Sequence, residues 1–107
     1  MKIQINTDNN VSLQGTLAQR IEDIVRLDLS RFSDQITRIE VHLSDENSLA
    51  KTGTLDKRCL LEARPAGEQP IAISYQAETT QEAVIGATRK MVSLLENALL
   101  LRGKWQQ

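Results

Sequence analysis

The sequence predicts an α+β domain of two layers, in which two helices cover one face of a four-stranded mixed sheet in the order βαβββα. Four segments alternate apolar and polar residues as half-buried strands do, and two longer segments repeat apolar residues with helical spacing. The chain has 107 residues, of which 40% are hydrophobic and 25% charged, with only five Gly and two Pro. This length and composition predict a single folded domain over residues 1–107.

The first half of the chain predicts a strand, a helix and a second strand. Residues 2–7 alternate, with isoleucines on the apolar side. From about residue 14 to residue 32, apolar residues recur along one helical face. Asp28 falls inside that stripe, so either the last turn is irregular or the carboxylate has a partner. Residues 35–44 alternate again, and because a helix joins the two strands, we expect them to be parallel.

The second half of the chain predicts a hairpin after a long connection. Residues 45–55 are mostly polar and form that connection. Residues 57–64 carry apolar side chains on both faces, which indicates a strand in a central position. Residues 65–68 read Pro-Ala-Gly-Glu, a composition typical of a turn, and residues 71–76 alternate as the fourth strand.

A long helix is predicted at the end of the sequence. Thr79, followed three residues later by Glu82, fits a capping box at the helix start. The helix can run to about Arg102 before Gly103 stops it. Its apolar face is wide enough to lie on a sheet and also touch a second helix, and comprises Val84, Ala87, Met91, Leu94, Leu95 and Ala98.

Charge and composition exclude several classes of protein. A formal net charge of −1 argues against a polybasic nucleic-acid binder, although one face can still be basic. Three aromatic residues are too few for the base-stacking platforms of most single-strand binders. The single cysteine, Cys59, excludes a disulfide framework and a cysteine-ligated zinc site. The start of the chain lacks a secretory segment, and no apolar run is long enough for a membrane, which predicts a cytoplasmic protein without membrane contact.

Two sites in the sequence are candidates for catalysis. His42 lies between Glu40 and Ser44 on one strand face, as either a catalytic cluster or a solvated polar face, and the second interpretation is favoured. Cys59 is either a reactive thiol near basic residues or a core residue, and the core role is favoured because free cysteines are usually buried. The sequence therefore predicts no enzyme activity, no metal site and no cofactor.

Basic residues lie outside the apolar helix faces and near the long connection. If they line up across two helices and one connection, they form a patch that can meet phosphates. The alternative is that these charges only solvate the surface, since acidic residues are interleaved with them. The candidate RNA-binding residues are Arg20, Arg26, Arg31, Lys51, Lys57, Arg58, Arg89 and Lys90.

Several short strings resemble a known family in their order, spacing and total length. They are the Ile-x-Ile strand at the start, a first helix ending near Phe32, residues 36–44, a hairpin containing Gly, and the last helix opening with residues 81–84. Together they are similar to the bacterial ribosome-hibernation proteins, namely hibernation-promoting factor and ribosome-associated inhibitor A, also called protein Y. The resemblance covers nearly the whole chain.

This resemblance implies a βαβββα fold akin to double-stranded-RNA-binding domains and a function without catalysis. It implies binding to the small ribosomal subunit and its rRNA, in the channel for messenger and transfer RNA, which would block translation in stationary phase or stress. Lys90 falls where the family carries a basic residue on the last helix, and Arg89 adjoins it.

The chain departs from the family pattern further along this helix. The family usually continues with several Lys and Arg, whereas here stand Ser93, Glu96 and Asn97. Each missing phosphate contact removes salt-dependent affinity, so we expect a weaker or differently oriented footprint. The alternative function is a protein-interaction module of the same fold with reduced RNA affinity, self-associating weakly through the apolar residues 99–101 of the last helix.

Overall fold

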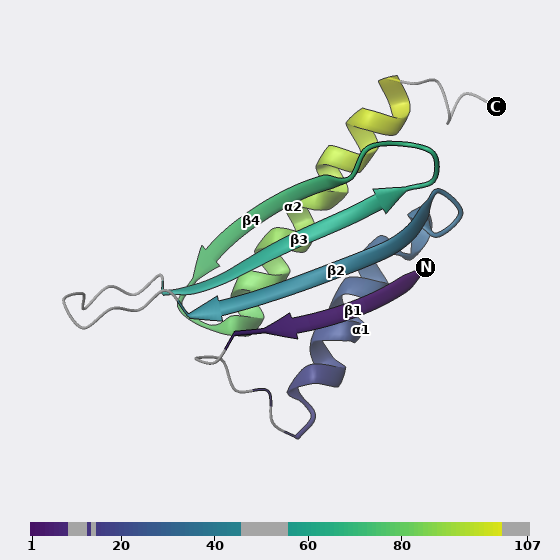
Figure 1. Cartoon of the computed structure of the whole chain (residues 1–107). Coiled ribbons are helices and arrows are strands. Elements are labelled where there is room, and N and C mark those ends of the chain that lie inside the picture. The colour runs from purple at the N-terminus through teal and green to yellow at the C-terminus, as the bar shows by residue number, and fades with distance from the viewer. Residues whose placement is uncertain (9–12, 14, 46–55, 102–107) are drawn as a thin grey trace.

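The computed structural model describes residues 1–8, 13, 15–45 and 56–101, and it confirms the predicted fold class (Figure 1). Both helices lie on the same face of one four-stranded sheet, so the molecule has two layers. The elements are β1 (Lys2–Thr7), α1 (Leu17–Leu29), a 3-10 turn (Ser30–Phe32), β2 (Ile36–Asp45), β3 (Lys57–Pro65), β4 (Ile71–Ala77) and α2 (Thr80–Leu101). Neither helix is both long and apolar enough, within the described residues, to cross a membrane.

The sheet has the strand order β1-β2-β3-β4. β1 pairs with β2 in parallel, and the other two pairs are antiparallel, which confirms the mixed sheet. β3 lies between β2 and β4, the central position predicted from its apolar residues on both faces. At the turn between β3 and β4, the Glu68 N–H donates to the Pro65 carbonyl at 3.2 Å, and Gly67 takes a φ of +72°, where a glycine is favoured.

The core lies between the sheet and the helices. Alternate residues of a strand point to opposite faces, so one set of strand residues meets the helices and the other set does not. The helix-facing residues of the two central strands are at most 2% exposed: Ile39, Val41, Leu43, Cys59, Leu61 and Ala63. The helices cover them with Ile21, Val25 and Leu29 from α1 and Val84, Ala87, Met91 and Leu95 from α2, all 0% exposed.

The end of α1 is irregular, as one of the two predicted alternatives has it. The α-helix stops at Leu29 and continues as the 3-10 turn, which buries Phe32. Asp28 does not lie in the apolar stripe, and that prediction is wrong. The buried residues of α1 follow the i, i+4, i+8 line from Ile21, which turns the neighbouring Asp28 about 100° away into the exposed surface.

The start of α2 is capped as predicted, because the Glu82 N–H donates to the Thr79 hydroxyl oxygen at 3.1 Å. Its apolar face differs from the prediction in two places. Leu94 is 38% exposed, whereas Thr88 is fully buried. Thr88 tolerates burial because its hydroxyl donates to the Val84 carbonyl at 2.7 Å, which satisfies the polar group inside the helix.

α2 approaches β4 closely at Gly86. A Cβ atom at this position would lie 2.2 Å from the ring of Tyr75, so the aromatic side chain occupies the space that any other residue would fill. Lys90, one turn further along α2, places its Nζ 5.6 Å from the centre of the same ring. Tyr75 therefore packs toward the helical layer and not toward the other side of the sheet.

Candidate nucleic-acid interface

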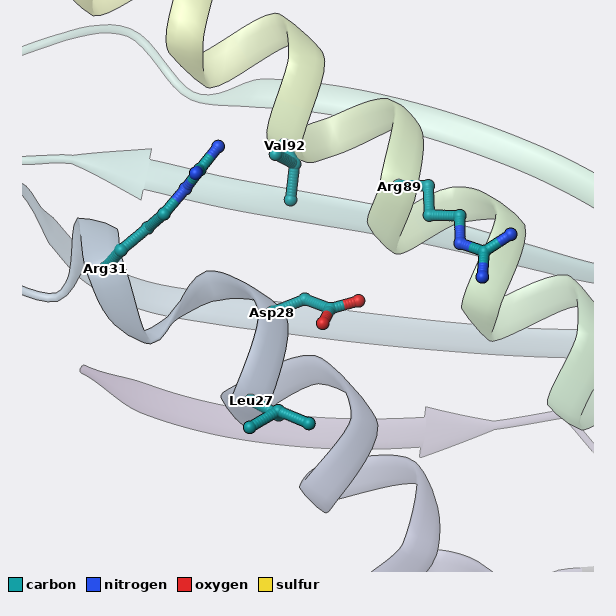
Figure 2. Close-up of a pocket in the computed structure, with 5 residues that line it drawn as sticks. All are labelled: Leu27, Asp28, Arg31, Arg89 and Val92. Carbon is teal, nitrogen blue, oxygen red and sulfur yellow. The ribbon is translucent and has the colours of Figure 1, made fainter.

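The helical layer presents a pocket between α1 and α2 (Figure 2), here called the interhelix groove. The pocket has a volume of about 330 Å³ and is lined by Leu27, Asp28, Arg31, Arg89 and Val92. Two of the predicted RNA-binding residues, Arg31 of the 3-10 turn and Arg89 of α2, thus line the same site. Asp28 lies between them in Figure 2, and its carboxylate reduces the positive potential that the two guanidinium groups create.

Other helical cations are engaged by neighbouring side chains. Arg26 forms an ion pair with Glu22 at 2.8 Å along α1. Arg31 forms an ion pair with Glu96 of α2. The carboxylate beside each of these arginines offsets its positive charge and so weakens its attraction for a phosphate. Arg20 donates to the amide oxygen of Gln81 at 3.5 Å, which leaves its charge uncompensated.

The helical layer as a whole is close to neutral. In the described residues of α1, the 3-10 turn and α2, five basic residues stand against five acidic ones. The basic residues are Arg20, Arg26, Arg31, Arg89 and Lys90, and the acidic ones are Glu22, Asp23, Asp28, Glu82 and Glu96. A neutral surface attracts a polyanion only where single cations project from it.

The predicted residues around the long connection lie apart from the interhelix groove. Lys57 is held at the start of β3 by Asp45 at 3.3 Å and Asp56 at 3.4 Å. Desolvation lowers the pKa of Lys57, but these two carboxylates outweigh it and raise the pKa above its ordinary value of 10.5. Arg58 lies on the side of the sheet away from the helices, and Lys51 falls outside the described residues.

The side of the sheet away from the helices, here called the open face, carries a second set of charges. Its residues are the strand positions that alternate with the core: Lys2, Gln4 and Asn6 of β1, Arg38, Glu40, His42 and Ser44 of β2, Arg58, Leu60, Glu62 and Arg64 of β3, and Ala72, Ser74 and Gln76 of β4. Lys2, Arg38 and Arg64 are not among the binding residues predicted from the sequence. Each lies on the polar side of an alternating strand, which is the signal that could have found them.

Side chains on β1 and β2 connect across the middle of the open face. Arg38 donates to the amide oxygen of Gln4 at 2.5 Å and forms an ion pair with Glu40 at 2.8 Å. The Nε2 atom of His42 lies 3.2 Å from a carboxylate oxygen of Glu40, and its Nδ1 atom lies 3.5 Å from the amide nitrogen of Asn6. This geometry is that of a solvated polar strand face, the favoured interpretation of the histidine cluster.

Glu40, His42 and Glu62 bring three ligand atoms within 4.8 Å of one another. Carboxylate and imidazole groups are ligands that divalent metals use in proteins. The guanidinium of Arg38 already neutralises Glu40, however, and it would compete with a cation for the same carboxylate. The cluster is therefore accounted for by the ion pair.

Cys59 lies in the core, as the favoured interpretation has it. The side chain is 0% exposed, and burial raises the pKa of its thiol to about 12. The thiolate, which is the reactive form, is therefore scarce at neutral pH in the folded protein.

The chain thus has the architecture of a two-layer βαβββα domain with basic residues on both layers. No family model and no curated protein matches its sequence. Two solved structures match its shape. A ribosomal subunit interface protein from Coxiella burnetii has a TM-score of 0.67 and 17% identity, with 92% of this chain and 97% of that chain covered. The N-terminal domain of Protein Y from Thermus thermophilus has a TM-score of 0.69 and 14% identity, with 91% and 98% covered.

These likenesses show the fold of the chain. They agree with the fold that the sequence resemblance implied, including the order of the elements. At this level of identity, side chains at a surface are free to differ while the core pattern is kept, so the surface residues have to be judged from their own geometry.

Proposed function

We propose that the chain is a ribosome-associated protein of the hibernation-factor type, which binds the small ribosomal subunit and its rRNA in the channel for messenger and transfer RNA. It would act in the bacterial cytoplasm during stress or stationary phase, and it would inhibit translation by occupancy and not by catalysis. The observation that carries the proposal is the likeness, over more than 90% of both chains, to a ribosomal subunit interface protein and to the Protein Y domain.

The cations on the helical layer support this function physically. Arg89 lines the interhelix groove and is exposed, and no ion pair to it is seen among the described residues. Lys90 is also exposed, and its Nζ lies 5.6 Å from the centre of the Tyr75 ring. The two residues project about 100° apart, so they can contact two different phosphates.

Sedimentation with purified ribosomes tests this function. We expect the protein to migrate with the small subunit through a sucrose gradient at low salt and to dissociate as salt rises. The double variant Arg89→Glu, Lys90→Glu should bind more weakly and with a flatter salt dependence, by a log–log slope on the order of one per contact. Recovery of the unmodified protein only in the top fractions at low salt would contradict the proposed function.

The neutral helical layer favours one alternative, a protein-interaction module of the same fold with reduced RNA affinity. The predicted self-association through residues 99–101 falls outside the described side chains. Light scattering tests it, because a self-associating protein gains mass with concentration and Leu100→Glu should reverse this. A monomeric mass at high concentration for both proteins would argue against the module's self-association.

A further inference from the structure

We propose that the open face of the sheet is a second phosphate-binding surface, which fits the backbone of an RNA and is built on Lys2, Arg38, Arg64 and Arg58. The identity of the RNA as ribosomal rests on the proposed function. The surface itself rests on the strand register and on the charges described below.

The register brings three cations into one row across three strands. Lys2 of β1 is the direct partner of Arg38 in β2, and Arg38 is the direct partner of Arg64 in β3. Neighbouring strands lie about 4.8 Å apart, so the row spans roughly 10 Å of the open face. Arg58 lies on the same side of β3 near the other end of the strands, separated from Arg64 by Glu62 and Leu60, and gives the face a second, separate positive position.

Most of these cations are available to a ligand. In the described part of the chain, Lys2, Arg58 and Arg64 have no ion-pair partner, and only Arg38 is paired. In the helical layer, by contrast, Arg26 and Arg31 are both paired. Arg20, Arg89 and Lys90 of the helical layer have no ion pair among the described residues, so each side offers three unpaired cations, and the open face sets its cations against fewer acidic residues.

The balance of charge on the open face also favours an anionic partner. Four basic residues stand against two acidic ones, Glu40 and Glu62, and Glu40 is already engaged by Arg38. Lys2, Arg38 and Arg64 are like charges directly opposite each other, which destabilises a sheet, and Glu40 offsets the charge of Arg38 alone. A phosphate laid across this row would relieve the repulsion, which gives the surface a direct reason to bind one.

A depression lies on the same face around Arg58, toward the end of the strands away from the row. It has a volume of about 310 Å³, and its lining includes Asn6, His42, Ser44 and Arg58 together with the acidic residue Asp8. These side chains supply hydrogen-bonding groups next to a guanidinium and a carboxylate, which suits the hydroxyl groups of a ribose. No aromatic residue stands among the open-face residues defined above, and Tyr75 packs on the other side against Gly86. The surface is thus suited to backbone contacts that do not depend on base sequence.

A binding experiment with matched variants tests the proposal. The probe is a fluorescein-labelled RNA duplex of mixed sequence, titrated with the protein at several salt concentrations and followed by anisotropy. The open-face variant is Lys2→Gln, Arg58→Gln, Arg64→Gln. The comparison variant is Arg20→Gln, Arg26→Gln, Arg31→Gln, which removes the same number of positive charges from α1 and the 3-10 turn. Both should melt like the unmodified protein, since all six residues are at or near the surface.

We expect the open-face variant to lose at least about tenfold in affinity and to flatten the salt slope by roughly two to three, and the comparison variant to lose less. Equal losses in the two variants, or an open-face variant that binds like the unmodified protein, would overturn the proposal. So would an unmodified protein that does not bind the duplex at low salt. Sedimentation with ribosomes is scored separately, so failure there rejects the ribosomal role while duplex binding through the open face still stands.

Discussion

The two faces of the sheet are made of the same strands, yet they differ in what their side chains do. Toward the helices, alternate residues such as Leu61 and Cys59 are fully buried and apolar. Away from the helices, the intervening residues are mostly polar and include the row Lys2, Arg38 and Arg64. A single alternation along each strand therefore serves stability on one side and leaves the other side free for binding.

The two outer surfaces of the molecule differ in a second way. The helical layer has equal numbers of basic and acidic residues, and its arginines at 26 and 31 are ion-paired. The open face has twice as many basic as acidic residues, and three of its four cations are unpaired in the described structure. A protein with a formal net charge of −1 can thus still have one surface that attracts phosphate. Net charge is a poor guide to nucleic-acid binding when the two faces of a small domain differ.

The largest expected difference between the faces concerns stability. Leu61→Ala should lower the free energy of unfolding by about 2–5 kcal/mol, because it leaves a cavity under the helices where the side chain is 0% exposed. Leu60→Ala, one residue away on the open face, is the matched control and should have a much smaller effect. Urea unfolding measures both. Similar losses for the two variants would contradict the division of β3 into a packed side and an open side.

The contact between α2 and β4 provides the next test. Gly86→Ala should lower stability by about 1–3 kcal/mol, because the added Cβ meets the ring of Tyr75 at 2.2 Å. The effect should shrink when Tyr75→Ala is present, since the ring that obstructs the methyl group is then gone. Thermal or urea unfolding of the two single variants and the double variant gives the coupling. Additive effects would show that Tyr75 does not pack on this side of the sheet.

Alkaline pH should lower the free energy of unfolding through Cys59, which lies on the packed side of the sheet. The thiol pKa is about 12 in the folded protein against an ordinary value of 9.0, so between these pH values the unfolded chain loses a proton that the folded chain keeps. The unfolding free energy should therefore fall by about 1.4 kcal/mol per pH unit within this window, and not below it. Cys59→Ala removes the titrating group and should show a shallower decline by that amount. An identical pH dependence in the two proteins would mean that the thiol is not buried.

The smallest expected effect concerns the paired cations of the helical layer. Glu96→Gln releases Arg31 from its ion pair across the two helices, and both side chains are about half exposed, at 55% and 52%. The stability should change by less than about 1 kcal/mol, as for other surface pairs. RNA affinity should rise several-fold because the cation becomes available and an acidic group is removed. Glu22→Gln, which releases Arg26, is the matched control away from the interhelix groove. An unchanged affinity with Glu96→Gln would show that the groove does not meet phosphate.

Much of the fold could be predicted because its signals are local. Alternation predicted the strands to within a residue or two of their bounds, and Thr79 marked the start of α2 three residues before Glu82. The sequence pattern predicts Leu94 in the core, whereas the structure exposes Leu94 and buries Thr88, and local signals could not predict this difference. A modest rotation of a wide apolar face decides between them, and that rotation is set by how α2 packs on the sheet and on α1.

The surface was harder to predict than the core. Basic residues on the helices could be identified from helical spacing, but the pair between Arg31 and Glu96 joins residues 65 positions apart. The row Lys2, Arg38 and Arg64 depends on the register of three strands. Two of these strands, β1 and β2, are parallel and are joined through α1. Neither arrangement has a local signal in the sequence, because both follow from tertiary packing.

The most direct measurement is an NMR titration that observes the arginine side chains themselves. The Nε–Hε signals of the 15N-labelled protein can be followed as the RNA duplex is added, which reports each guanidinium separately. We predict that Arg58 and Arg64 of the open face shift first and furthest, while Arg26, held by Glu22, shifts little. Shifts confined to Arg31 and Arg89 of the interhelix groove, with Arg58 and Arg64 unchanged, would contradict a phosphate-binding open face.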